Sequence, residues 1–369
     1  MFKNIKELPI GMRDIIGEDC LKIEKILDST NKIFNNFSYE EVITPSIEFY
    51  DTFKGISKAI NQDEMYKLSD REGKLLSLKV DATLPIARVV SSKLKDKKLP
   101  IRIRYSTNVF KVSKKLSGKR NESLEVGIEL ISDENFHSEV EAILIAIETI
   151  KGLEIKNFKI EIGHIGIVKR VIKLLNLDIE KKDEFIELVE EKRLIDLEEF
   201  LGELNLEDNL KIFLKQFPWM FGDFSNLKNE KKYIKDIIIQ EYVDYIEKLY
   251  GVFKELGLDK YLSYDLSVAS KIDYYSGVVF KGYLENQGNH VIQGGRYDSL
   301  MSLYGRDVSA IGFSLNIDDL LVNMESIEKE DASKLSYTDE NYIAILKEAI
   351  KLNQEGKKII LVKEELSWL

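Results

Sequence analysis

A long helical stretch that interrupts a series of strand-like segments is the feature that most constrains this fold. From about residue 165 to about residue 260, apolar side chains recur at helical spacing and no strand-like segment intervenes. Short segments rich in β-branched and aromatic residues come before this stretch and return after it. We therefore predict one core domain, residues 1–325, that is interrupted by a helical insertion at about 165–260.

The strand-like segments of the core are separated by turn-forming sequences. DREG and SGKRNE divide the β-rich segments between residues 64 and 132, and this spacing favours antiparallel pairing. Helical patterns lie on either side, at 19–37 with one apolar face and at 136–153 with acidic residues at its positive end. The pattern predicts an α+β fold in which helices flank an antiparallel sheet.

Residues 326–369 have a different character from the core. A polar linker, EKEDASKLSYTDE, leads into a short strand, a helix and a second strand. This is too little chain for an independent domain of typical size. We interpret the segment as a linker followed by a short strand-helix-strand unit.

Composition excludes several classes of protein. The 369 residues carry a formal net charge of −10, which provides no overall attraction for nucleic acid. Cys20 is the single cysteine, the first residues lack a signal-peptide pattern, and no apolar run approaches the roughly 20 residues that span a bilayer. We expect a cytoplasmic location away from membranes. The three histidines lack metal-ligand spacing and no nucleotide-binding motif occurs, so we expect neither a metal nor a cofactor.

Two acidic segments indicate a polar pocket. Glu125, Gly127 and Glu129 share one face of a strand at period two, and two carboxylates on one face need water, a cation or hydrogen-bond donors nearby. Asp81 and Thr83, also two residues apart in KVDAT, can add a carboxylate and a hydroxyl to the same cavity. A surface turn is the competing interpretation for that pair.

Three further segments allow two interpretations each. Tyr274 and Tyr275 point to opposite faces if their segment is extended, so one can line a cavity, or both can simply pack. Arg296 and Asp298 in QGGRYDSL can be partners, although a turn with a surface ion pair explains such a string more often. The basic loop that follows Asn108 can hold phosphates, or it can be a solvated hairpin tip. Its positive residues are Lys111, Lys114, Lys115, Lys119 and Arg120.

Together and in this order, these segments resemble the catalytic core of histidyl-tRNA synthetase over about residues 5–325. LPIGMRDIIGED resembles the N-terminal signature of that core, and KIDYYSGVVFKGY is similar to its histidine-pocket element. VITPSIEFYDTF, YSTNVFKVS through EVGIELI, and SAIGFSLNIDDLL resemble class II motifs 1, 2 and 3. The resemblance implies a class II aminoacyl-tRNA synthetase-like fold. The C-terminal unit then corresponds to no more than a remnant of an anticodon-binding domain.

The departures from the synthetase pattern fall on the groups that hold ATP. Lys111 stands where motif 2 has an arginine, and Ser113 replaces an acidic residue that helps to hold adenosine. Asp319, preceded by Asp318, stands where motif 3 has a second arginine, and Ser270 replaces an arginine beside the substrate carboxylate. A carboxylate cannot supply the positive charge that stabilises a triphosphate. The resemblance therefore implies that synthetase activity is lost and that no residue is catalytic.

A synthetase core without these arginines resembles the family of regulatory subunits of ATP phosphoribosyltransferase. This implies a non-catalytic subunit that the short catalytic subunit requires for the first step of histidine biosynthesis, with feedback inhibition by histidine. It also implies a homodimer formed through the motif 1 region. The alternatives are an active histidyl-tRNA synthetase, an enzyme that forms histidyl adenylate, and a module that binds RNA.

The resemblance also implies roles for the pocket residues. Asp81 would pair with the ammonium of histidine, Thr83 would assist, and Glu129 and Tyr275 would meet the imidazole, with Tyr274 beside them. Lys111 is the group that can reach the ligand carboxylate. Glu125 stands where the family has glutamine, and Lys79 and Val80 replace an Arg-Pro pair. Such a pocket is either a histidine sensor or a relic, in which case histidine binds at the contact with the catalytic subunit.

Overall fold

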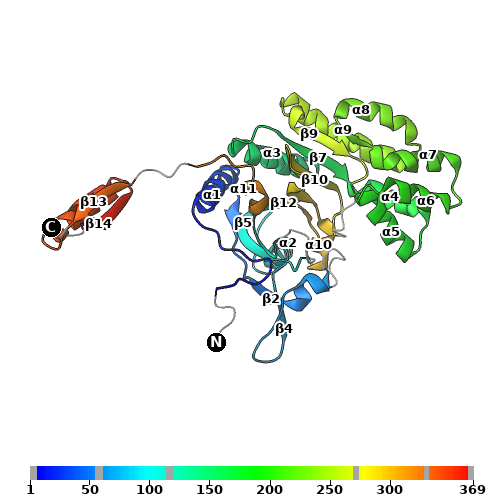
Figure 1. Cartoon of the computed structure of the whole chain (residues 1–369). Helices are drawn as coiled ribbons and strands as arrows, with labels where there is room; N and C mark the ends of the chain where they lie inside the picture. The colour runs from blue at the N-terminus through cyan, green and yellow to red at the C-terminus, as the bar shows by residue number, and fades with distance from the viewer. Residues whose placement is uncertain are drawn as a thin grey trace. The chain divides into compact units, whose positions relative to one another are not determined.

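The computed structural model describes residues 6–54, 61–113, 120–133, 135–268, 274–327 and 332–364. The chain divides into two units. The main unit comprises Met1–Ile15 and Ile23–Met324, and the second comprises Ile16–Lys22 and Glu325–Leu369. Figure 1 shows the elements of each.

A nine-stranded sheet forms the centre of the main unit (Figure 1). In spatial order its strands are β1 (Glu40–Glu41), β5 (Ile101–Phe110), β6 (Glu122–Ser132), β12 (Ser309–Asn316), β11 (His290–Arg296), β10 (Val278–Leu284), β7 (Phe158–His164), β9 (Leu262–Asp265) and β8 (Phe221–Gly222). The predicted antiparallel pairing is confirmed from β5 through β7, whereas β1 with β5 and β7 with β9 pair in parallel. The sheet is therefore mixed. Each of the two parallel pairs is joined by a long crossover connection, which parallel strands require.

Helices cover one face of this sheet. α3 (Phe136–Gly152) packs against β6, β7, β11 and β12, and α1 (Glu18–Asn36) contributes Ile26 and Phe34 to the same apolar core. Strand alternation supplies the sheet side of that core, since Val126, Ile128 and Leu130 of β6 point to the helices. The intervening residues of β6 point to the opposite face.

The helical insertion follows β7 directly. Its helices are α4 (Ile165–Leu175), α5 (Ile179–Glu190), α6 (Leu194–Gly202), α7 (Asp208–Gln216), α8 (Phe224–Glu230) and α9 (Ile237–Glu255). β8 also lies inside this stretch and pairs with β9, so the expectation of a purely helical stretch was wrong for those two residues. A two-residue strand is too short to produce a period-two pattern.

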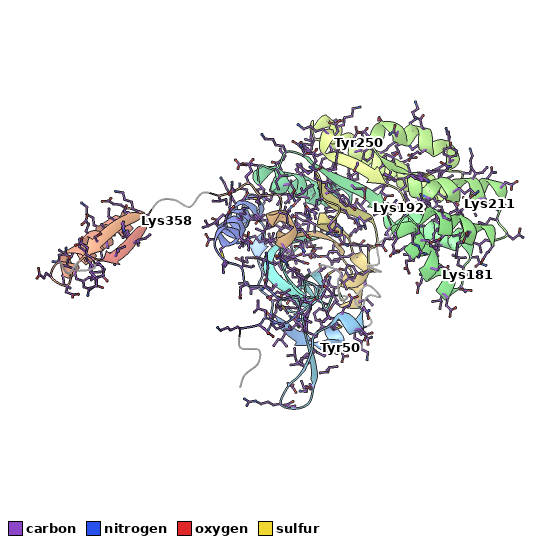
Figure 2. All side chains as sticks on the ribbon, viewed as in Figure 1. Tyr50, Lys181, Lys192, Lys211, Tyr250 and Lys358 are labelled. Carbon is purple, nitrogen blue, oxygen red and sulfur yellow. The ribbon has the colours of Figure 1, made fainter. Side chains whose placement is uncertain are left out.

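A partly exposed lysine joins the insertion to the sheet. Lys192, in the turn between α5 and α6, donates to the Pro218 carbonyl at 3.1 Å, to Asp265 Oδ2 at 3.0 Å and to Ser267 Oγ at 2.5 Å (Figure 2). Its backbone φ of 53° lies in the left-handed region. Three acceptors therefore partner the ammonium, which ties the turn between α5 and α6 to Pro218 and to the residues at the end of β9.

The opposite face of the sheet is covered only in part. α2 (Thr83–Ser92) and α10 (Asp298–Leu303) contact each other there and share a second apolar core with β5 and the segment before β10. A three-stranded sheet, in the order β2 (Ile47–Phe49), β4 (Leu75–Leu78) and β3 (Lys67–Ser69), lies in this part of the unit. α11 (Ile317–Leu321) follows β12 and packs with the helix-side core.

The remaining elements are short. The 3₁₀ helices are η1 (Tyr50–Thr52), η2 (Gln62–Glu64), η3 (Phe217–Trp219), η4 (Lys231–Tyr233) and η5 (Asp259–Tyr261). In the second unit, β13 (Ser333–Tyr337) pairs in parallel with β14 (Ile359–Lys363), and α12 (Tyr342–Gln354) connects them. Across the described ranges, no helix combines the length and the apolar character needed to cross a membrane.

Arg296 is the centre of a buried polar cluster at the end of β11. Its Nε donates to Asp298 Oδ2 at 2.6 Å, and its other nitrogens donate to Glu139 Oε1 at 3.3 Å and to Ser309 Oγ at 2.8 Å. Glu139 also accepts from the Tyr245 hydroxyl of α9 at 2.5 Å. The interpretation of Arg296 and Asp298 as a surface ion pair was therefore wrong, because Arg296 is only 7% exposed and joins the sheet to α3.

Replacing Arg296 by methionine leaves the buried Glu139 carboxylate without its cationic partner. We expect Arg296→Met to lower the free energy of unfolding by about 3 kcal/mol, because removal of one member of a buried ion pair leaves an uncompensated charge. Urea denaturation followed by circular dichroism measures this. Arg71→Met, in an exposed turn, is the control and is expected to have little effect. Equal midpoints for the two variants would contradict the assigned role of Arg296.

Candidate functional site

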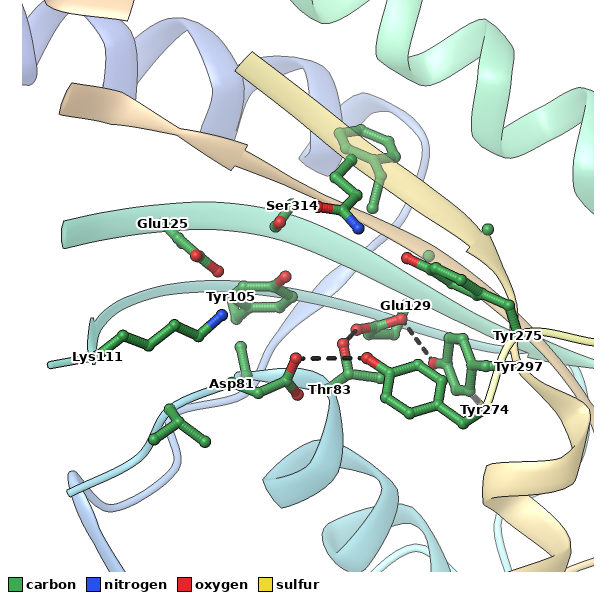
Figure 3. Close-up of a pocket in the computed structure, with 16 residues that line it drawn as sticks. Asp81, Thr83, Tyr105, Lys111, Glu125, Glu129, Tyr274, Tyr275, Tyr297 and Ser314 are labelled. Atoms are coloured by element: carbon green, nitrogen blue, oxygen red, sulfur yellow. Dashed lines mark hydrogen bonds between the residues drawn. The ribbon is translucent and has the colours of Figure 1, made fainter. Parts of the chain in front are cut away.

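A pocket opens on the sheet face opposite α3 and is lined by residues from distant parts of the chain (Figure 3). The structure brings together all seven residues predicted for the histidine pocket. They are Asp81, Thr83, Lys111, Glu125, Glu129, Tyr274 and Tyr275. The strands β5, β6, β11 and β12 supply the floor, and the start of α2 and the segment before β10 supply the walls.

Glu129 is the most deeply placed carboxylate of the pocket. It is 1% exposed, and each oxygen accepts one hydrogen bond: Thr83 Oγ1 donates to Oε1 at 2.7 Å and the Tyr297 hydroxyl donates to Oε2 at 2.6 Å. Burial raises the pKa of Glu129 to about 8, against the lowering effect of those two donors. The two donors therefore fix the orientation of the carboxyl group, and burial makes it easier to protonate than an exposed glutamate.

Asp81 and Glu125 lie nearer the mouth. Asp81 Oδ1 accepts from the Leu84 backbone N–H at 2.9 Å, and the Tyr274 hydroxyl approaches Asp81 Oδ2 at 3.4 Å. Burial raises the pKa of Asp81, and it raises the pKa of Glu125 to about 7, while the positive charge of Lys111 opposes both shifts. The competing interpretation of Asp81 in a surface turn is therefore wrong.

Both tyrosines of the DYY sequence line the pocket. Tyr274 and Tyr275 are each 6% exposed, with ring centroids 5.4 Å apart in an edge-to-face arrangement. The condition under which they would point to opposite faces, an extended segment, is not met, because this segment is irregular and β10 begins only at Val278. Period-two alternation applies to extended strands alone.

Three glycines make room on the floor. A Cβ at Gly312 would lie 1.8 Å from a Glu129 oxygen, and one at Gly127 would lie 2.5 Å from the Tyr105 hydroxyl. A Cβ at Gly295 would lie 2.9 Å from the Tyr275 ring. Sheet backbone can approach these side chains so closely only without a Cβ.

Part of the lining was not predicted from the sequence. Tyr105, Gln293, Tyr297 and Ser314 belong to the pocket as well. Tyr297 lies inside the QGGRYDSL string, but nothing local predicted its hydrogen bond to Glu129. Tyr105 lies opposite Gly127 across the β5–β6 pair. Gly127, between Glu125 and Glu129, was therefore the sequence signal that a large side chain packs against this strand.

The positions that depart from the synthetase pattern lie beside the pocket. Lys111 is exposed at its mouth, and Ser113 donates from its hydroxyl to the Arg120 carbonyl at 3.1 Å. The backbone N–H of Asp319 donates to Asn316 Oδ1 at 3.2 Å in the first turn of α11. The predicted Ser270, Lys114, Lys115 and Lys119 lie outside the described residues.

Asp318, which was named only as the neighbour of Asp319, contacts two arginines. Arg13 Nη2 donates to Asp318 Oδ1 at 2.7 Å, and Arg120 Nη1 donates to the same oxygen. All three side chains are partly exposed. The Asp318 carboxylate therefore partners two guanidinium groups of the same chain. This pairing weakens the attraction of those groups for an external phosphate.

The charges of the pocket indicate what it can bind. Three carboxyl groups, one ammonium and several hydroxyls suit a small ligand that carries a positive group, a carboxylate and a hydrogen-bonding ring. Within the described ranges, no group of three or more His, Cys, Asp or Glu side chains is arranged to hold a metal ion.

Comparisons with known proteins agree on one family. The histidyl-tRNA synthetase family model matches residues 11–320. Proteins named ATP phosphoribosyltransferase regulatory subunit are 36% identical in Clostridium botulinum (strain Langeland), where the match covers 99% of this chain and 87% of the relative. In Clostridium novyi the identity is 40%, over 87% of this chain and 77% of the relative.

Solved structures agree with the sequence comparisons. The crystal structure described as an ATP phosphoribosyltransferase regulatory subunit/histidyl-tRNA synthetase from Bacillus halodurans has a TM-score of 0.88 at 30% identity, over 99% of this chain and 94% of that chain. Histidyl-tRNA synthetase from Nostoc has a TM-score of 0.80 at 19% identity, over 98% of this chain and 87% of that chain, and shares the fold. The predicted α+β, class II synthetase-like fold is confirmed.

The raised pKa of Glu129 predicts how stability changes with pH. The folded state keeps a proton up to about pH 8, whereas the unfolded state releases it near the ordinary value of 4.5. Stability should therefore fall as the pH rises between these values. Between pH 5.5 and 8.5, we expect Glu129→Gln to gain about 3 kcal/mol of unfolding free energy relative to the native chain. Urea denaturation at the two pH values checks this, with Glu72→Gln in an exposed turn as control. A pH-independent difference would refute the assigned pKa.

Proposed function

The chain belongs to the histidyl-tRNA synthetase family and, within it, to the ATP phosphoribosyltransferase regulatory subunits, and we propose that it activates the short catalytic subunit and makes it sensitive to histidine. It is not itself the catalytic subunit. One observation carries the proposal: the pocket has kept the groups that suit an amino acid, while the positions that would hold a triphosphate carry Asp319 and the self-paired Asp318.

We propose that histidine is the ligand of the pocket. Its ammonium would pair with Asp81, its imidazole would lie between Glu129 and Tyr275, and its carboxylate would meet the ammonium of Lys111. Glu125 adds a second carboxyl group near the mouth, which favours a positively charged ligand. The burial that raises the carboxyl pKa values also strengthens each interaction with the ligand, because little water competes inside the pocket.

Adenylation of that histidine would fail for electrostatic reasons. The reaction develops negative charge on the α-phosphate, and positive groups must already be in place to stabilise it. Lys111 offers a point charge in place of a planar guanidinium, and Asp319 adds negative charge. Arg13 and Arg120 lie nearby but already share Asp318. The pocket would therefore bind histidine without activating it.

Regulation then requires that histidine favours one state of the assembled complex over another. An inhibitor can shift an equilibrium only by the difference between its affinities for the two states. We propose that the catalytic subunits are active in the complex with the empty regulatory subunit. Histidine in the pocket would stabilise a less active arrangement of the same complex.

Mixing the chain with a short-form catalytic subunit tests the activating role. We expect formation of phosphoribosyl-ATP to rise at least about tenfold over the catalytic subunit alone, which corresponds to roughly 1.4 kcal/mol of transition-state stabilisation. Added histidine should reverse the gain. An unchanged rate on mixing would refute the proposal, and exchange of pyrophosphate into ATP by the chain alone would favour the synthetase alternative.

Two variants locate the histidine in that assay. Asp81→Asn should keep the activation and lose most of the inhibition, because it removes the charge that pairs with the ligand ammonium. Asp96→Asn, in an exposed turn after α2, is the control. Full inhibition of the Asp81→Asn complex would place the regulatory histidine at the contact between subunits instead.

We also propose that the chain forms a homodimer through the motif 1 region. The alternation on β2 is inverted relative to a surface strand: Ile47 and Phe49 are exposed, whereas Glu48 between them is 8% exposed and pairs with Arg88 at 2.6 Å. Cross-strand pairing with Leu76 and Leu78 of β4 extends the apolar face. We propose that a second copy of the chain packs against this apolar face of β2 and β4, because a polar inner face and an apolar outer face suit an interface.

A charge on that face should separate the dimer. We expect Phe49→Asp to raise the dimer dissociation constant at least about 100-fold, because the carboxylate would have to be desolvated in an apolar contact. Sedimentation equilibrium measures the change. Ser69→Asp adds the same charge on β3 but on the other face, and it should leave the dimer intact. A native chain that stays monomeric at high concentration would refute the interface.

A further inference from the structure

The first helix of the insertion contacts both the segment that forms a pocket wall and α9. α4 begins directly after His164, where β7 ends, and packs against α9. Resting on the proposed function, we propose that α4 couples occupancy of the pocket to the insertion and that Lys169 is the residue that positions Tyr275 for this purpose.

Three contacts join the first turns of α4 to the segment that carries the pocket tyrosines. The Ile165 N–H donates to the Gly277 carbonyl at 3.1 Å. The Lys169 ammonium donates to the Tyr275 carbonyl at 2.7 Å. The Ile165 side chain, 5% exposed, packs in the same apolar core as Tyr274 and Tyr275. The segment Tyr274–Gly277 therefore depends on α4 for its position.

The opposite side of this segment is held by the sheet. The Ser276 N–H donates to the Arg296 carbonyl at 2.7 Å, and Ser299 Oγ donates to the Tyr274 carbonyl at 2.8 Å. The Tyr275 ring lines the pocket, whereas its carbonyl accepts from α4. A ligand that shifts the Tyr275 backbone would therefore also move the acceptor of the Lys169 ammonium.

The residue after Lys169 reaches in the other direction. Arg170 Nε lies 3.1 Å from both oxygens of Asp236, and Nη2 lies 2.7 Å from Oδ2. Asp236 also accepts from the backbone N–H groups of Ile238 and Ile239, so it caps α9. The Arg170 guanidinium lowers the pKa of Asp236, so this contact remains ionised at neutral pH. Two consecutive residues of α4 thus contact the pocket wall and the start of α9.

Aromatic packing makes the junction between α4 and α9 stiff. His164, which accepts from the Gly166 N–H at 3.1 Å, stacks on Tyr242 of α9 with ring centroids 4.3 Å apart. A Cβ at Gly166 would lie 2.6 Å from the Tyr242 ring. A displacement of α4 is therefore passed on to α9 rather than absorbed between them.

Hydrogen exchange measured by mass spectrometry on the whole chain tests this coupling without ligand. Lys169→Met should speed amide exchange in residues 274–284 about fivefold, because one charged hydrogen bond to the segment is lost. Lys169→Arg should restore slow exchange, since a guanidinium can donate to the same carbonyl. Lys173→Met, exposed on the same helix, is the matched control and should leave exchange unchanged. Methionine keeps helix propensity in every case.

The reciprocal variant tests transmission through the helix. Arg170→Met acts at the α9 side, yet coupling requires that it also speed exchange in residues 274–284, by about threefold. Native rates in that segment for either Lys169→Met or Arg170→Met would overturn the inference, whatever binds in the pocket.

L-histidine then separates this inference from the proposed function. With the native chain, we expect it to slow exchange in α4 and α9. With Arg170→Met, slowing should persist in α4 and disappear in α9. If L-histidine does not bind the native chain by calorimetry, the proposed pocket function fails, and the ligand-free rates still decide the role of Lys169. Binding that slows exchange at the pocket but not in α9 would overturn the coupling alone.

Discussion

The pairing of β7 with β10 on one edge and with β9 on the other is the constraint on which the rest of the structure depends. β7 precedes the helical insertion, whereas β9 and β10 follow it. These two later strands can pair with β7 only if the insertion returns the chain to the two sides of β7. The register from Val278 opposite His164 to Leu284 opposite Phe158 fixes where β10 begins. It therefore also fixes the irregular segment before β10, which carries Tyr274 and Tyr275 into the pocket.

The same pairing brings α4 beside the pocket. α4 begins directly after the last residue of β7. Because β7 and β10 are antiparallel and His164 lies opposite Val278, the start of α4 lies next to the first residue of β10. The insertion is thus attached where β7 ends, beside the segment before β10 that forms a wall of the pocket. Lys192 then holds the far side of the insertion to β9 through Asp265 and Ser267.

Electrostatics separate this pocket from the site of an enzyme that uses ATP. Glu129 lies under the floor with Thr83 and Tyr297 as donors, and Gly312 leaves the space for its carboxyl group. Burial of acidic groups raises their pKa and favours a ligand that brings positive charge. A triphosphate needs the opposite arrangement, and the nearby guanidinium groups are already paired with Asp318. In the proposed function, the pocket therefore binds histidine without adenylating it.

The sequence by itself determined the fold class, the interruption of the core and the seven residues of the predicted pocket, because period, turn chemistry and motif order are local properties. Tertiary structure decided what depends on distant partners. Tyr297 became a donor to Glu129, Arg296 became buried against Glu139, and Asp318 became the partner of Arg13 and Arg120. Tyr274 and Tyr275 line one cavity because their segment is irregular and β10 begins only at Val278. These contacts form between segments that are far apart in the chain. No single segment therefore records which side chain it will oppose in the folded protein.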